Sequence, residues 1–263
     1  MMVLISNILA IFRKELQGYF ASPLAYVVAA IFWLLSGFFF WMILYSIIDQ
    51  VAVQDRAGVP TPPTDVAYEF LRWFMSIMGP LSLVVLPILS MGLYAEERKR
   101  GTLELLATSP MTNWTVAVGK LLGVLTFFSF MVLPVLAYEA IAFNAATPPI
   151  PPTVPLLAHA GLLLLAASIL SLGMFLSSLT DSSILAAILT FALSLFLWVI
   201  DLIARNIGGS VGEALGHLSL LSNYSNLVQG IFDTSSLILF ASYIILGIFL
   251  TAGSIEALRF QRS

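Results

Sequence analysis

The stretch YAEERKRGTLELLATSP, residues 94–110, lies between two long apolar segments and decides how the chain is organised. Its charged run, Glu96 to Arg100, precedes a Leu-rich run that is too short to cross a membrane or to fold alone. Only 10% of the 263 residues are Asp, Glu, Lys or Arg, and 60% are apolar. A soluble domain carries about 25% charged residues. The sequence therefore predicts a polytopic membrane protein in which this stretch is a hydrated exit from a span.

Six apolar segments are long enough to cross the roughly 30 Å hydrocarbon layer as helices. Their approximate bounds are Pro23–Ile48, Trp73–Ala95, Val116–Phe143, Leu156–Leu179, Ser183–Ala204 and Leu237–Leu258. The fourth and fifth segments are joined only by TDSS, residues 180–183, so they must form an antiparallel hairpin. We therefore expect a single all-α membrane domain of six transmembrane helices over residues 1–263.

The positions of Lys and Arg predict the orientation of these spans. One side of the six-span arrangement carries Arg13, Lys14, Arg98, Lys99, Arg100, Lys120, Arg259 and Arg262, and the other carries Arg56, Arg72 and Arg205. The first side should be cytoplasmic, together with both termini. The Pro-rich connections GVPTPPTD (58–65) and ATPPIPPTVP (146–155) would then be short external caps, because proline cannot continue a helix.

Residues 1–20, before the first span, have the pattern of a helix that lies flat in the membrane interface. Its apolar half contains Leu4, Ile5, Ile8, Leu9, Ile11, Phe12 and Leu16. Arg13 and Lys14 fall on the polar half, whereas Glu15 falls among the apolar residues. Glu15 either lies near an edge and reaches water, or it pairs with a basic residue such as Arg98 or Arg100.

Ionisable residues within the spans need a structural or functional explanation, because inserting each one at mid-membrane costs about 2.5–3.5 kcal/mol of free energy. Asp201 and Arg205 are spaced to pair on one helix face, as are Glu256 and Arg259. Glu139 has no such neighbour, so it reaches for water at the interface or lines a pathway. The spans contain no series of buried acids and histidines such as a proton relay requires, which argues against an ion-coupled carrier.

Several kinds of chemistry are excluded by composition. The chain has no cysteine, and its two histidines, His159 and His217, are far apart without a carboxylate at ligand spacing, so they are interpreted as interfacial polar residues. The basic residues form no patch for nucleic acid. Gly119-Lys120 lacks the other residues of a P-loop, so the chain itself binds no ATP. We expect no catalytic, cofactor-binding or metal-binding residues.

The Leu-rich run after the charged exit needs a surface to pack against. Gly101 breaks the charged run, Thr102 offers a capping hydroxyl, and TLELLAT can form about two helical turns. Because two turns are unstable alone, Leu103, Leu105 and Leu106 require a contact. A second protein on the cytoplasmic face would supply it, and so would the lipid headgroups; physics alone leaves both open.

The order EERKRGTLELLATSPMTNWTVAVGKLLG after a second span resembles the cytoplasmic coupling-helix segment of ABC transporter type 2 permeases. RKELQGYFASPLAYVVAAIFW and HLSLLSNYSNLVQGIFDTSSLILF are similar to the corresponding parts of the gliding-motility-associated subgroup. The most specific portion is a Glu-rich, Gly-Thr-x-Glu-x-Leu element at Glu96, Glu97, Gly101, Thr102, Glu104 and Leu105.

The resemblance implies a permease subunit for ATP-driven export in the bacterial cytoplasmic membrane. Two halves, identical or related, would associate in the bilayer, and separate ATP-binding subunits carrying ATP and Mg²⁺ would hold the coupling segment, residues 96–110. Residues 205–236 would fold back as short external helices. The residues implied in ATPase coupling are Glu96, Glu97, Arg98, Gly101, Thr102, Leu103, Glu104, Leu105 and Leu106, and those of the interfacial connecting helix are Arg13, Lys14 and Glu15. The alternatives are a non-transporting membrane scaffold and an ion-coupled carrier or channel.

Overall fold

The computed structural model describes residues 2–57, 65–103, 111–144, 146, 150–207 and 209–260, and within these ranges all regular structure is helical. Six helices have the length and apolarity to cross a membrane. They are Pro23–Gln54, Val66–Lys99, Asn113–Asn144, Thr153–Leu179, Ser183–Ala204 and Thr234–Ala257. The expected all-α class with six spans is confirmed. Residues 58–64 of the first Pro-rich connection and 147–149 of the second lie outside the described ranges. Residues 153–155 of the second were expected in the cap but belong to the helix that begins at Thr153.

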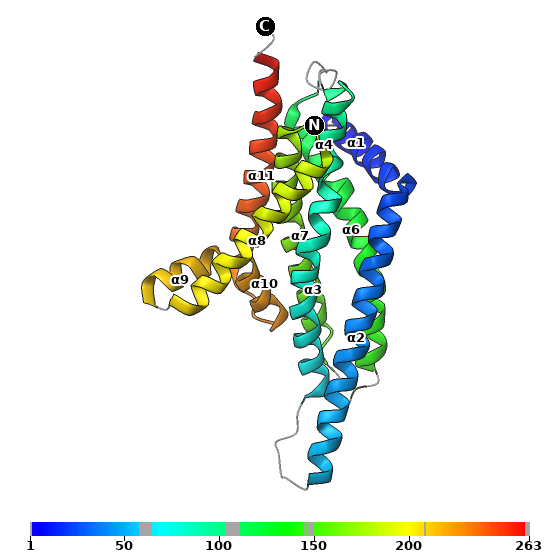
Figure 1. Ribbon diagram of the computed structural model, residues 1–263, viewed down its shortest axis with the longest axis vertical. Helices are drawn as coiled ribbons and strands as arrows, with labels where there is room; N and C mark the ends of the chain where they lie inside the picture. The colour runs from blue at the N-terminus through cyan, green and yellow to red at the C-terminus, as the bar shows by residue number, and fades with distance from the viewer. Residues whose placement is uncertain are drawn as a thin grey trace.

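Ten helices are described, and Figure 1 shows the longest of them running side by side. They are α1 (Met2–Ala21), α2 (Pro23–Ala57), α3 (Val66–Ser90), α4 (Gly92–Lys99), α6 (Asn113–Asn144), α7 (Thr153–Leu179), α8 (Ser183–Ile207), α9 (Gly209–Leu218), α10 (Leu220–Val228) and α11 (Thr234–Phe260). Several are longer than the apolar segments of the sequence. The second span, for example, begins at Val66 rather than Trp73, because Asp65 caps it by accepting the N–H of Tyr68 at 3.0 Å.

Helix α7 is the centre of the bundle. It packs against α3, α4, α6, α8, α10 and α11, and it lies in the middle of the view in Figure 1. By contrast, α2 and α8 leave much of their apolar surface uncovered, with Leu34 and Ile184 more than two-thirds exposed. An apolar surface of this kind suits a lipid environment, in which exposed leucine and isoleucine carry no penalty.

The contact between α7 and α11 depends on small residues. An ideal Cβ built at Gly247 of α11 would lie only 2.6 Å from the backbone carbonyl carbon of Ser171 on α7. The Ser171 hydroxyl donates to the carbonyl of Tyr243 at 3.3 Å, and the Ser168 hydroxyl donates to that of Phe240 at 3.4 Å. Small and hydroxyl-bearing residues of this kind let two membrane helices approach closely.

Two short helices, α9 and α10, occupy the connection between α8 and α11. In Figure 1, α9 projects away from the bundle, whereas α10 lies against it. The hydroxyl of Ser219 caps α10 and donates to the Asp201 carboxylate of α8 at 2.7 Å. The side chains of Arg205 and Arg259 lie outside the described ones, so the expected pairs Asp201–Arg205 and Glu256–Arg259 remain predictions.

The expectation that Glu139 and His159 are interfacial is wrong. Glu139 of α6 is 1% exposed and His159 of α7 is 4% exposed, and Oε2 of the glutamate lies 3.6 Å from Nδ1 of the histidine. Position along a single span suggested access to the interface. The packing of α6 against α7 within the bundle removes that access, and sequence position carries no information about this packing.

Candidate coupling site

Helix α4, which leads into the coupling segment, begins at a break after α3. In an uninterrupted helix the N–H of Ala95 would donate to the carbonyl of Met91. Instead, the Ser177 hydroxyl of α7 accepts the N–H groups of Tyr94 and Ala95, at 3.1 and 3.0 Å, and donates to the Met91 carbonyl at 2.7 Å. A side chain inserted into the ladder in this way is a recognised cause of helix breaks. Helix α4 is thereby attached to α7.

Replacing Ser177 by Ala is expected to destabilise the protein by about 1–3 kcal/mol, because two buried N–H groups and a carbonyl lose their partner. The matched control is Ser129→Ala, whose hydroxyl bonds only to the Leu125 carbonyl of its own helix. Tryptophan fluorescence during thermal unfolding measures both variants, since the chain has five tryptophans. Equal unfolding midpoints in the two variants would show that Ser177 does not stabilise the attachment of α4 to α7.

The other end of α4 is fixed by Arg98 and Thr102. The Arg98 guanidinium donates to the Ser178 carbonyl at 2.8 Å, at the C-terminus of α7 where carbonyls lack helical partners. Gly101 has a φ of +70°, which glycine adopts without strain, and it ends the run as expected. The N–H and hydroxyl of Thr102 both donate to the Glu97 carbonyl, at 2.9 and 3.2 Å. Thr102 therefore caps the helix that precedes it.

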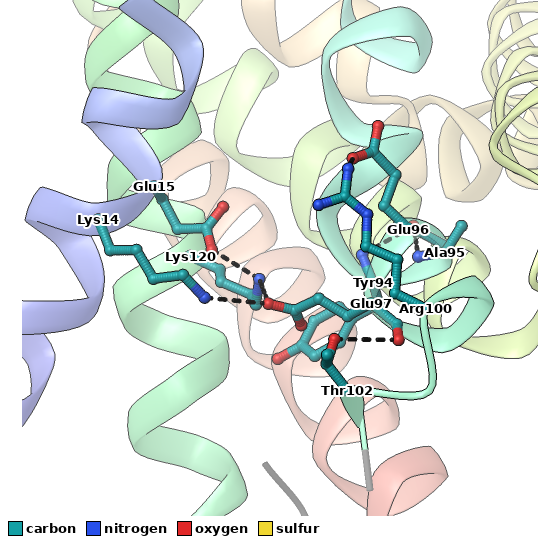
Figure 2. A network of polar contacts seen from close by, with 10 residues as sticks. Lys14, Glu15, Tyr94, Ala95, Glu96, Glu97, Arg100, Thr102 and Lys120 are labelled. Carbon is teal, nitrogen blue, oxygen red and sulfur yellow. Dashed lines mark hydrogen bonds and ion pairs between the residues drawn. The ribbon is translucent and has the colours of Figure 1, made fainter. Parts of the chain in front are cut away.

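Four charged side chains, Lys14, Glu15, Glu97 and Lys120, meet beside α4, and we call them the ion cluster. Figure 2 shows Lys14 and Glu15 extending from α1 toward Lys120 of α6 and Glu97 of α4. The Lys120 side chain is 3% exposed, and its Nζ lies 2.7 Å from Glu15 Oε1 and 3.0 Å from Glu97 Oε1. The exposed Lys14 approaches the same Glu97 oxygen at 3.4 Å. The cluster thus joins α1, α4 and α6.

Glu15 pairs with a basic residue, as one of the two sequence-based interpretations expected, but that residue is Lys120 and not Arg98 or Arg100. Its partner Lys120 lies 105 positions away in the chain. The GKLLG motif, residues 119–123, carried a signal for this contact. An ideal Cβ at Gly119 would lie 2.8 Å from Ile11, and one at Gly123 would lie 2.7 Å from the Cβ of Glu15. The two glycines let α1 lie directly on α6, which brings Glu15 beside Lys120.

An aromatic residue and an unpaired oxygen complete the cluster. The Lys120 ammonium lies 5.0 Å from the ring centroid of Tyr94, at cation–π distance. Within the described part of the chain, the Tyr94 hydroxyl and Glu97 Oε2 are buried without a hydrogen-bond partner. On α1, burial first and then the negative charges of Glu15 and Glu96 raise the pKa of Tyr19, so its phenol stays protonated. The Tyr19 hydroxyl donates to the Leu89 carbonyl of α3.

The remaining predicted coupling residues are distributed differently. Glu96 is exposed and contacts the exposed Arg100 at 3.5 Å, a surface pair that adds little stability. Leu103 is 3% exposed and belongs to the chain's own apolar core, so the contact that it was expected to need is supplied by the chain itself rather than by a second protein or lipid headgroups. Glu104, Leu105 and Leu106 lie outside the described residues. Arg13 is exposed on α1 and takes no part in the ion cluster.

A bundle of six membrane-length helices, with a short charged segment fastened to α1, α6 and α7 at one end, defines a polytopic membrane protein. The sequence profile described as "ABC-2 family transporter protein" matches residues 9–263, so the chain belongs to the ABC-2 transporter family. It is thus a membrane permease of an ABC transporter. The gliding-motility-associated subgroup remains a prediction. A comparison with curated protein sequences finds no match. In the described residues, no three His, Asp or Glu side chains gather as a metal site would require.

Proposed function

We propose that this chain forms the membrane pathway of an ATP-driven exporter, in which two such halves associate and separate subunits bind ATP and Mg²⁺. Membership of the ABC-2 family supports a permease role and an ATP-binding partner. The distribution of Lys and Arg supports an orientation in which the ion cluster and both termini face the cytoplasm. The ion cluster is the observation that carries the proposed coupling.

Force from the ATP-binding subunit enters at residues 96–110 and leaves by two connections. Glu97 lies near the start of this segment and Lys120 lies on α6, which follows it in the chain, so their contact at 3.0 Å joins the segment to α6. Lys120 passes displacement along α6 and, through Glu15, to α1. Arg98 and Ser177 pass displacement to α7, the central helix. A rigid connection of this kind moves packed helices together rather than deforming one of them.

Copurification tests where the ATP-binding subunit is seated. Leu105→Asp in the tagged full-length chain is expected to reduce the recovered Mg²⁺-dependent ATP hydrolysis at least about tenfold, since burying a charge in an apolar contact costs well over 1.4 kcal/mol. The control is Leu218→Asp, which alters a half-exposed leucine at the C-terminus of α9, away from the coupling segment. Leu103 is unsuitable because it is buried within the chain itself.

Equal recovery with Leu105→Asp and with the control would count against the coupling segment as the seat. A non-transporting scaffold would lose the subunit in the same way. It would nevertheless show no nucleotide-dependent change in the helices of the bundle. Recording the tryptophan fluorescence of the recovered complex with and without ATP and Mg²⁺ therefore separates these two functions.

A further inference from the structure

A second polar site lies away from the ion cluster, between α6, α7 and α10. Glu139 and His159 face each other there at 3.6 Å, and both are almost completely buried. Within the described part of the chain, neither oxygen of Glu139 has a hydrogen-bond partner, and neither does Nε2 of His159. Nδ1 of His159 lies 2.9 Å from the Pro155 carbonyl of its own helix, to which its N–H donates. Buried polar atoms without partners are rare and need an explanation.

Helix α10 packs against α7 close to this pair. Its Leu227 lies against Gly161 of α7, where an ideal Cβ would be 3.0 Å from the leucine Cβ. Tyr224, one turn earlier on α10, donates its hydroxyl to the Met75 carbonyl of α3 at 2.7 Å. Burial, with a smaller contribution from the charge of Glu139, raises the pKa of Tyr224, as expected when a carboxylate is nearby. Tyr224 therefore stays protonated and supplies no charge to the pair.

Among the described side chains, the charged groups of the neighbouring elements are already paired elsewhere and none compensates the charge of the pair. From α7 the titratable group is His159 itself, and from α10 it is Tyr224. On α3, Glu69 and Arg72 pair with each other at 3.2 Å. From α11, the Ser236 hydroxyl donates to Asn223 of α10 at 2.7 Å. On α6 itself, the neighbouring Tyr138 packs its ring against Phe40 of α2.

The charge of the pair depends on how many titratable protons it holds. With one proton, the pair is neutral, either as carboxylic acid with imidazole or as carboxylate with imidazolium. Without that proton, a carboxylate is buried with no donor and no counter-charge. With two protons, an imidazolium is buried in the same way. A buried charge that lacks a partner is strongly unfavourable, so only the one-proton state suits the packed arrangement.

We propose that Glu139 and His159 form a proton-binding site that holds one proton while α6, α7 and α10 are packed together and that opens to water when this proton is lost. The helices α6, α7 and α10 separate at this site on deprotonation, because water then solvates the carboxylate. If opening releases one proton, the ratio of open to packed molecules rises about tenfold per pH unit. This rise begins once the pH exceeds the midpoint at which the open, water-exposed pair loses that proton. The proposal is independent of the ATP-binding partner.

Thiol labelling tests the proposal directly, because the chain contains no cysteine. Leu227→Cys places a reporter on the buried face of α10, and Gln229→Cys places a control at an exposed position of the same segment. Each full-length chain is labelled with a charged methanethiosulfonate in lipid nanodiscs between pH 6 and 10. The rate ratio of reporter to control cancels the pH dependence of the thiolate. This ratio is expected to rise about tenfold per pH unit above the midpoint.

Two further backgrounds make the result decisive. In Glu139→Gln the side chain cannot lose a proton, so the ratio is expected to stay flat over the same range. If that variant fails to assemble, the apolar double replacement Glu139→Leu with His159→Leu serves instead, since apolar residues often replace a buried polar pair without loss of stability. A flat ratio in the parent chain, or an unchanged slope in either background, would overturn the proposal.

Discussion

Replacing Lys120 by Met is expected to destabilise the protein by about 3–5 kcal/mol and to abolish coupling. Methionine keeps the length of the side chain and its contact with Tyr94. It nevertheless leaves Glu15 and Glu97 facing each other without the buried ammonium that lies within 3.0 Å of both. Removing one partner of a buried ion pair has this magnitude because the remaining charge is left uncompensated. Thermal unfolding followed by tryptophan fluorescence measures the loss.

Two further variants separate charge from packing. Lys99→Met removes an exposed lysine of α4 and should change stability by no more than about 0.5 kcal/mol. The triple variant Glu15→Gln, Glu97→Gln, Lys120→Met removes every buried charge of the cluster, so its stability should return close to that of the parent. If the ionic contacts transmit the displacement from the ATP-binding subunit, this variant still binds that subunit but no longer couples ATP hydrolysis to movement of the helices. A Lys120→Met chain as stable as Lys99→Met would contradict the description of the cluster.

The number of spans could be predicted from sequence because it depends on local composition. A run of about 20 apolar residues is visible in the sequence, and this is the length that a helix needs to cross the bilayer. The ends of the helices depend on other physics. Helix α2 continues to Ala57 through the polar residues QDR, and α3 begins at the Asp65 cap. A hydropathy criterion cannot detect helical turns that extend beyond the hydrocarbon.

The candidate site was predictable only where its residues are neighbours in sequence. The charged exit and the break at Gly101 are local, and both are found where the sequence placed them. The contact between Glu15 and Lys120 is not local, because it depends on how α1 and α6 are aligned. Glycines 119 and 123 indicated a close helix contact but could not identify the helix that makes it. The Ser177 hydroxyl gave no sequence signal, since a serine within an apolar span usually bonds to its own helix.

Burial was the least predictable property. Leu103 and Glu139 were each interpreted from the residues beside them in the chain, and in each case a distant segment covers the side chain. Covering Leu103 stabilises the start of the coupling segment without any partner. Covering Glu139 is instead destabilising, because its carboxyl group is buried and no described residue donates a hydrogen bond to it. Such an arrangement persists only because the surrounding packing holds it.

Replacing Gly247 by Leu is expected to destabilise the protein by at least about 3 kcal/mol, the upper part of the range for overpacked cores. The first added atom would already lie 2.6 Å from a backbone carbon of Ser171. Backbone cannot rotate away as a flexible side chain does, so α7 and α11 would have to move apart. That separation would also break the Ser171 and Ser168 hydrogen bonds to α11. Because α7 contacts most of the bundle, the effect should spread beyond this seam.

Gly253→Leu is the matched control for this variant, on the same helix. An ideal Cβ at Gly253 meets no atom within 4 Å, and the residue is exposed. Removing a glycine from a helix interior should stabilise the chain there by about 0.5–1 kcal/mol, since glycine loses the most backbone freedom on folding. The two substitutions therefore have opposite expected signs in unfolding measured by tryptophan fluorescence. Similar midpoints for both would mean that α7 and α11 are not in backbone contact at Gly247, and the central position of α7 would then have to be reconsidered.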